Sequence, residues 1–238
     1  MKIHRNIAQG SVEWFNLRAG VVTASNADAL VTPLGKVKTS DAAKTLMTQL
    51  LAENWIGGAL PSAQGSFDTE QGKYLEEKAR PAFTLETSKT VEEVAFIESD
   101  DGRIGCSPDG NLTEETAGLE IKCPRIENHI RYVLDGVVPP DYVIQVQFSL
   151  HVTKWPVWYF MSFRSGHAPL ILRVEPDVKI QSAIAEALEI FFENYDAAWE
   201  KYVKHNGGLP KQRGIKPIPS YRQNPPKYQP DPKGDVIP

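Results

Sequence analysis

The spacing of the apolar residues switches between helical and alternating patterns along the chain, and this succession constrains the fold most. Apolar residues recur every three or four positions over 41–56 and about 68–83, which predicts two amphipathic helices. Pro81 should lie near the last turn of the second helix or kink it. From 91 to 123 short runs alternate between apolar and polar residues around turn-forming segments, which predicts a meander of antiparallel strands.

The second half of the chain repeats both patterns. Helices are expected at 125–135 and 141–152, strands at 155–163 and 170–174, and a long helix from Asp177 onward. Helices on both sides of a mixed central sheet make an α/β or α+β fold. We expect one domain over residues 1–206 and a proline-rich, basic tail over 207–238.

Charge and composition exclude several classes of protein. Hydrophobic residues make up 41% of the 238 residues and charged residues 24%, which are values of a globular protein. No apolar run approaches a membrane span and the first residues do not form a signal peptide, so we expect a cytoplasmic protein without membrane contact. The formal net charge of -4 argues against a passive DNA-coating protein, but it leaves room for an enzyme with one basic groove.

The most informative stretch joins Asp109 to Glu120 and Lys122. In an extended strand Glu120 and Lys122 share one face while Leu119 and Ile121 point into the apolar layer. A hairpin return would bring the Asp109 carboxylate beside that of Glu120. Hard oxygen ligands suit Mg²⁺, and a lysine beside them can orient or deprotonate a water, which is equipment for phosphodiester hydrolysis. The alternative is a surface salt-bridge strand.

These residues resemble a known family. Ser107-Pro108-Asp109-Gly110 and Leu119-Glu120-Ile121-Lys122-Cys123-Pro124 are similar to the core of the PD-(D/E)XK nuclease superfamily, in the form of the lambda-exonuclease and YqaJ-type viral recombination nucleases. Three further segments match in the family's order, namely 14–25, 72–80 and 145–153. The resemblance therefore implies a restriction-endonuclease-like core.

Carried over by position, the resemblance assigns roles. It implies that Asp109, Glu120 and the backbone carbonyl of Ile121 bind metal, and that Lys122 handles the attacking water. The resemblance also implies an acidic metal ligand on a helix, which is Glu76, with its neighbour Glu77 as the alternative. Gln145 would lie near the attacked phosphate, and Arg18 and Ser25 would hold the 5′-phosphate.

Weaker candidates complete the set of DNA contacts. They are Trp14, for which a core role is an equal alternative, and the basic residues Lys36, Lys38, Arg125 and Arg131, for which the alternative is a solvated surface charge. The five histidines show no zinc-ligand spacing.

The resemblance implies a function. The implied function is that of a 5′-to-3′ double-strand DNA exonuclease that leaves 3′ overhangs for recombination by strand annealing. The implied cofactor is Mg²⁺, which Mn²⁺ can replace, with two ions in the site. It further implies a homotrimeric ring, a single-strand annealing protein as partner, and a phage or prophage gene expressed in a bacterial cell. The alternatives are an endonuclease of the same superfamily and a non-catalytic module that binds DNA ends or a partner.

Overall fold

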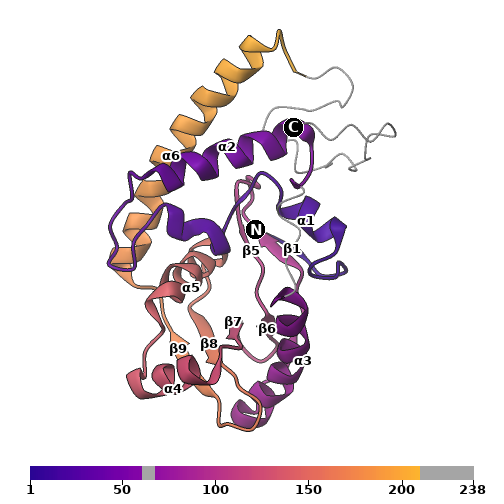
Figure 1. The fold of residues 1–238 in the computed structure, drawn as a ribbon, viewed down its shortest axis with the longest axis vertical. Coiled ribbons are helices and arrows are strands. Elements are labelled where there is room, and N and C mark those ends of the chain that lie inside the picture. The colour runs from indigo at the N-terminus through magenta and orange to yellow at the C-terminus, as the bar shows by residue number, and fades with distance from the viewer. Residues whose placement is uncertain (61–67, 210–238) are drawn as a thin grey trace.

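The strands form two sheets that helices flank and separate (Figure 1). The computed structural model describes residues 1–60 and 68–209, and the side chains of residues 68–74 and 76 also lie outside the description. The expected mixed α/β architecture is confirmed. The tail expected from residue 207 lies almost wholly outside the described residues.

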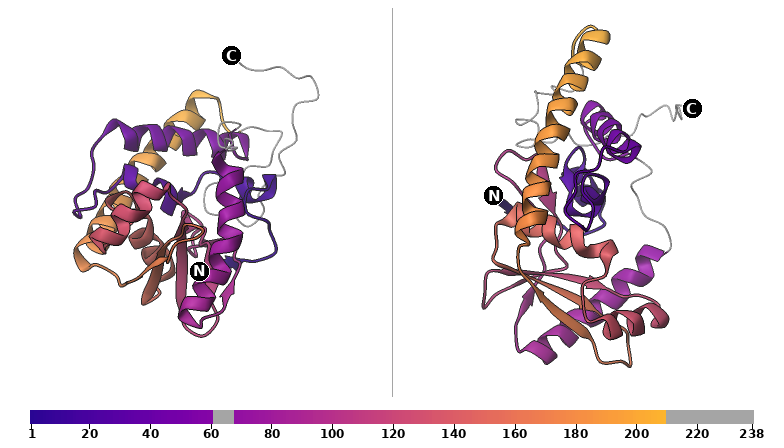
Figure 2. Two further views of the ribbon diagram at one scale, coloured as in Figure 1. Left: turned by 60° about the horizontal axis from the view of Figure 1, so that its bottom comes forward. Right: turned by 90° about the vertical axis from the view of Figure 1, so that its left-hand side faces the viewer.

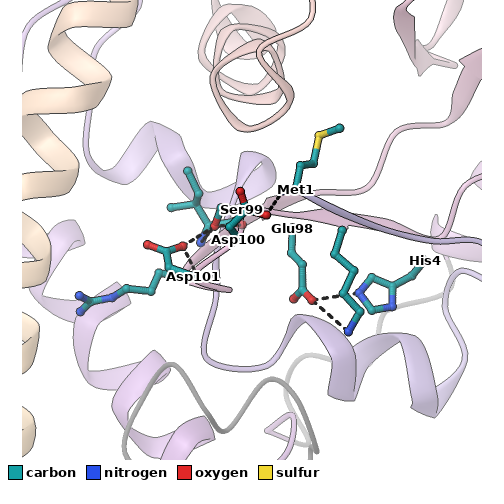
Figure 3. A network of polar contacts seen from close by, with 9 residues as sticks. Met1, His4, Glu98, Ser99, Asp100 and Asp101 are labelled. Atoms are coloured by element: carbon teal, nitrogen blue, oxygen red, sulfur yellow. Dashed lines mark hydrogen bonds and ion pairs between the residues drawn. The ribbon is translucent and has the colours of Figure 1, made fainter.

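The first sheet has four strands in the order β1-β4-β5-β2. They are β1 (Lys2–His4), β4 (Phe96–Glu98), β5 (Ile104–Cys106) and β2 (Val22–Thr23). Only β2 and β5 run parallel within it. Figure 3 shows how β1 is fixed at the edge, where Glu98 accepts a hydrogen bond from His4 at 3.1 Å and lies 3.5 Å from the Lys2 ammonium. The amino terminus of Met1 pairs with Asp100.

The second sheet has five strands in the order β3-β6-β7-β8-β9. They are β3 (Val91–Glu92), β6 (Gly110–Leu112), β7 (Ala117–Lys122), β8 (Val157–Ser162) and β9 (Leu170–Val174). Here β7 and β8 are parallel and the other pairs antiparallel. The antiparallel pair β4–β5 agrees with the expected meander, but the expected continuation from 103–106 to 119–123 is wrong, because the chain passes from one sheet to the other between β5 and β6. Strand β6, which pairs with β7, lies partly in a segment that was expected to connect strands.

Seven helical elements complete the described residues. They are α1 (Val12–Arg18), the 3₁₀ helix η1 (Ala24–Ala29), α2 (Asp41–Ile56), α3 (Asp68–Thr87), α4 (Ile126–Asp135), α5 (Pro140–Thr153) and α6 (Val178–His205). Asp177 caps α6 by accepting the N–H of Ile180, as its position before the apolar stripe predicts. The end predicted for α3 is too early, because Phe83 is fully buried and its packing carries the helix beyond Pro81.

The two faces of the five-stranded sheet pack against different helices. One face buries Val157, Tyr159 and Met161 of β8 with Ala79 and Phe83 of α3. The opposite face buries Trp158 and Phe160 in the larger core that includes Val146 and Phe148 of α5. Because side chains alternate along a strand, each residue of the neighbouring strand β7 points either to α3 or to α5.

Helix α5 lies at the centre of the molecule. It contacts η1, α6, β4, β5 and β8, and so joins the two sheets (Figure 2). Helix α6 packs against α5 and extends away from the sheets, and α2 packs against α6 and η1. Within the described residues, no helix combines the length and the apolarity that a membrane span requires.

Candidate functional site

A buried carboxylate occupies the α5 face of β7. Leu119 and Ile121 are 0% and 2% exposed on the α3 side, so Glu120 points to the opposite side, where it is 3% exposed. The Lys122 ammonium lies 2.6 Å from Oε1 of Glu120, and Nε2 of Gln145 on α5 donates to the same oxygen at 2.6 Å. The predicted shared face of Glu120 and Lys122 is thus present, and α5 adds the predicted Gln145.

Asp109 lies beside this cluster, in the segment between β5 and β6. Its backbone N–H donates to the carbonyl of Leu119 at 2.9 Å, and its carboxylate accepts the N–H of Ile121 at 2.6 Å. The carboxylate is therefore fixed against the backbone of β7, one residue from Glu120. This is the hairpin return that the sequence predicts.

Two further side chains hold the same segment by its carbonyl groups. Nε of Arg80 on α3 donates to the carbonyl of Asp109 at 2.7 Å, and Arg80 also pairs with Glu93 at 2.8 Å. The amide of Gln9 donates to the carbonyls of Pro108 and Val94, at 2.9 Å and 2.8 Å. The backbone that carries Asp109 is thereby fixed from both sides.

The charges in the cluster are coupled. Burial alone lowers the pKa of Lys122, but the carboxylates of Glu120 and Asp109 outweigh burial and raise it above its ordinary value. The ammonium also lies 4.9 Å from the ring centroid of Tyr142. Lys122 is consequently a firmly protonated cation that neutralises the buried Glu120.

The donor set fits a hard divalent cation. Asp109 and Glu120 offer carboxylate oxygens, which Mg²⁺ prefers and completes with water or phosphate oxygens. Among the described residues, no three His, Cys, Asp or Glu side chains gather into a fuller metal site. The predicted helical ligand Glu76 belongs to α3, but its side chain lies outside the described residues. A bound ion would supply charge neutralisation and an activated water, and Lys122 is within the cluster to orient that water.

A second site surrounds Arg18, the last residue of α1. Its guanidinium donates to the hydroxyls of Ser107 and Ser25, both at 2.8 Å, and lies 4.2 Å from the ring centroid of Trp14. Burial lowers the pKa of Arg18 to about 10, so it stays protonated at neutral pH. A guanidinium whose described hydrogen bonds go to neutral hydroxyls keeps its charge available for an anion.

Ser107 connects the two sites, and the sequence did not single it out as a functional residue. It binds Arg18, while Asp109, two positions later, belongs to the acidic cluster. The signal that could have found it is its place in the Ser107-Pro108-Asp109 run, which carries a hydroxyl beside the predicted ligand.

Comparison with known families places this arrangement. The profile of the YqaJ-like viral recombinase domain matches residues 13–156, which is more than half of the chain. The chain belongs to the YqaJ-like viral recombinase family. A comparison with curated protein sequences found no significant match.

Solved structures resemble this YqaJ-like chain over most of its length. The alkaline exonuclease LHK-Exo from Laribacter hongkongensis is 26% identical, with a TM-score of 0.71 over 83% of this chain and 98% of that one. The structure of LHK-Exo with dAMP is 25% identical, with the same TM-score and coverage. A phage-related exonuclease from Haemophilus somnus 129PT shares the fold at 15% identity, with a TM-score of 0.58 over 76% of this chain and 96% of that one.

The weaker candidates of the YqaJ-like chain lie in different places. Trp14 is half-buried, donates from Nε1 to the carbonyl of Ala95 at 2.8 Å, and lies against the Arg18 guanidinium, so it has the packing role considered for it and lies beside the Arg18 site. Lys36 and Lys38 lie between η1 and α2, where Lys38 donates to the Asp28 carbonyl at 2.5 Å. Among the described contacts, neither lysine reaches the acidic cluster.

The two arginines of the α4 region are exposed. Arg125 precedes α4 as its N-cap residue. Arg131 lies 5.4 Å from the ring centroid of Tyr132, whose ring packs edge-on against Tyr142 below Lys122. Arg131 is therefore linked to the acidic cluster through two aromatic rings, whereas no described contact links Arg125 to it.

Proposed function

We propose that the protein is a metal-dependent 5′-to-3′ exonuclease that degrades the 5′-phosphorylated strand of double-stranded DNA and leaves 3′ overhangs. One observation carries this proposal. Asp109 of a buried acidic cluster with its own lysine lies two residues along the chain from Ser107, whose hydroxyl accepts a hydrogen bond from the Arg18 guanidinium. The exonuclease activity named for the similar solved structures supports the reaction class.

The residues divide the chemistry as follows. Asp109, Glu120 and the Ile121 carbonyl hold Mg²⁺ or Mn²⁺, with Glu76 as a further ligand and two ions in the working enzyme. The metal supplies charge neutralisation at the attacked phosphate and an activated water. Lys122 orients that water through the N–H groups of its ammonium, and Gln145 stays on Glu120, where its amide supports the carboxylate near the attacked phosphate.

The Arg18 site recognises the end of the strand. A terminal phosphate carries more charge than an internal one and matches the guanidinium fork and the hydroxyls of Ser25 and Ser107. A strand end held there has its next phosphodiester linkages near Asp109, because Ser107 and Asp109 belong to the same short segment. This proximity favours removal of nucleotides from the 5′ end over cutting inside a strand.

The proposal extends to assembly and partners. A homotrimeric ring around DNA would let a protein with a net charge of -4 remain on its substrate without strong static binding. The overhang would be used by a single-strand annealing protein in the bacterial cytoplasm, with a phage or prophage as the source of the gene. The basic tail over 207–238 contacts DNA or this partner.

Digestion of linear duplexes tests the activity. Duplexes with a 5′-phosphate or a 5′-hydroxyl are incubated with Mg²⁺ or with EDTA, using wild type, Lys122→Ala and the control Lys44→Ala, whose side chain is 77% exposed. We expect loss of the 5′-phosphorylated strand that requires both Mg²⁺ and Lys122 and is unchanged in the control. Cutting of closed circular DNA would replace the exonuclease by an endonuclease, and absence of any cleavage would leave a binding module.

Two further measurements test the assembly and the tail. Light scattering should give the mass of three chains, and a monomer mass with and without DNA would refute the ring. Deletion of residues after Gly208 should weaken DNA or partner binding, and unchanged binding and processivity would remove the role proposed for the tail.

A further inference from the structure

Glu53 is a buried carboxylate in an unfavourable position. It is 4% exposed and lies in the last turn of α2, where the helix dipole disfavours a negative charge. Among the described residues, no lysine, arginine or histidine forms an ion pair with it. It accepts hydrogen bonds from the backbone N–H of Gly20 at 2.7 Å and from the Gln49 amide at 3.1 Å. A buried charge without an ion pair is costly, so its retention calls for a compensating role.

The contact with Gly20 controls the turn that follows α1. Gly20 has a φ of +71°, and a Cβ there would lie 2.3 Å from Oδ1 of Asn54, so no other residue fits. Asn54 lies 3.4 Å from the Gly20 carbonyl and donates to the Tyr195 hydroxyl at 2.5 Å. Two consecutive residues of α2 therefore hold both polar groups of one glycine, with support from α6.

This turn joins the two walls of the Arg18 site. Arg18 lies two residues before Gly20 and Ser25 five residues after it, while Val21 and Val22 between them are 1% and 0% exposed. A displacement of Gly20 is thus passed to both walls through a short, closely packed segment.

The charge of Glu53 acts on the same site. Burial lowers the pKa of Arg18, and the carboxylates of Glu120 and Glu53 act in the opposite direction. Glu120 is already paired with Lys122. Glu53 consequently provides a second carboxylate that favours the charged guanidinium without binding it and blocking its donors.

We propose that Glu53 is a positioning residue that determines specificity for the 5′-phosphate, acting through Gly20 on the placement of Arg18. This inference rests on the proposed function. Glu53 does not touch the substrate; it fixes the distance between the Arg18 fork and the Ser25 hydroxyl. Variants of Glu53 therefore bind the 5′-phosphate less well, while hydrolysis at the acidic cluster is retained.

The test compares the initial rates on 5′-phosphate and 5′-hydroxyl ends in the same full-length preparation. The ratio of the two rates cancels any inactive fraction, so it does not respond to a loss of folded protein. We expect Glu53→Ala to lower this ratio about tenfold or more, because a small misplacement of a positioning group has effects of this size. The loss should lie in KM for the phosphorylated end and not in kcat. Glu53→Gln keeps an acceptor for Gly20, but a neutral amide oxygen binds the N–H less strongly than a carboxylate does, so this variant should lower the ratio about threefold.

Glu98→Gln is the matched control, since Glu98 is equally buried at 3% exposure and its side chain contacts β1. It should change the melting temperature but not the ratio. If the wild-type ratio is well above one and neither Glu53 variant changes it, the inference about Glu53 is overturned while the proposed Arg18 site stands. A wild-type ratio near one would overturn the Arg18 site itself, and the inference with it. If Glu53→Ala does not fold, the ratio of Glu53→Gln decides.

Discussion

Removal of the Lys122 ammonium should destabilise the protein through Glu120, independently of any effect on activity. In Lys122→Met the side chain keeps its length but loses its charge, and Glu120, at 3% exposure, keeps only the hydrogen bond from Gln145 among its contacts with the described residues. Breaking a buried ion pair from one side costs about 3–5 kcal/mol. The Lys122 side chain is 24% exposed, so solvent screens part of this cost and we expect about 2–3 kcal/mol.

The double variant supplies the control. In Lys122→Met with Glu120→Gln the buried charge at position 120 is removed as well, and the new amide oxygen can still accept the hydrogen bond from Gln145. We expect it to recover about 1–2 kcal/mol relative to Lys122→Met alone, since the single variant loses stability through an uncompensated carboxylate.

Urea unfolding in EDTA measures both variants. With a slope of roughly 2–3 kcal/mol per M, the single variant should lower the midpoint by about 1 M. A single variant that unfolds at the wild-type midpoint, or a double variant no more stable than the single one, would refute the argument that Lys122 stabilises the fold by neutralising Glu120.

Three further predictions follow from other contacts. Arg80→Ala should raise the Mg²⁺ concentration for half-maximal activity and weaken Mn²⁺ binding about tenfold, because Arg80 holds the carbonyl of Asp109. Calorimetry measures the Mn²⁺ affinity, and an unchanged affinity would contradict this expectation. Gly118→Ala should cost about 2–3 kcal/mol in a thermal melt, since its Cβ would lie 2.5 Å from the buried Trp158 ring; an unchanged melting temperature contradicts it. Burial raises the pKa of Cys106 from 9.0 to about 12, so at pH 8.5 iodoacetamide should leave Cys106 unmodified in the native protein. Stability should fall as the pH rises from 9 towards 12, because only the unfolded thiol ionises in that range. Alkylation of Cys106 in the native protein, read by mass spectrometry, would contradict the first expectation.

Local patterns predicted most of the elements. The helices over 41–56 and from Asp177 follow directly from their apolar stripes, and the alternation in β7 predicts the shared face of Glu120 and Lys122. The division into two sheets was not predictable in this way, because the parallel pairing of β7 with β8 joins residues about forty positions apart. Such pairing depends on tertiary packing and leaves no local signal.

The candidate site shows the same division. Arg18, Ser25 and Gln145 were identified through a resemblance, and the structure places each in a described contact with another predicted site residue. Glu53 and Arg80 received no role, because each acts on the backbone of a distant segment, at Gly20 and at Asp109. A side chain that binds a backbone group leaves no partner residue type for a sequence pattern to show.

The short passage between the two sheets has a mechanical consequence. Ser107 and Asp109 are joined by a single proline, and the carbonyls along this passage are held by Gln9 and Arg80. Under the proposed function, the spacing between the captured strand end and the cleavage point is therefore set by covalent geometry and not by how tightly the sheets pack. Mutations or temperatures that loosen the packing would slow the enzyme, yet each cycle would still release a product of the same length.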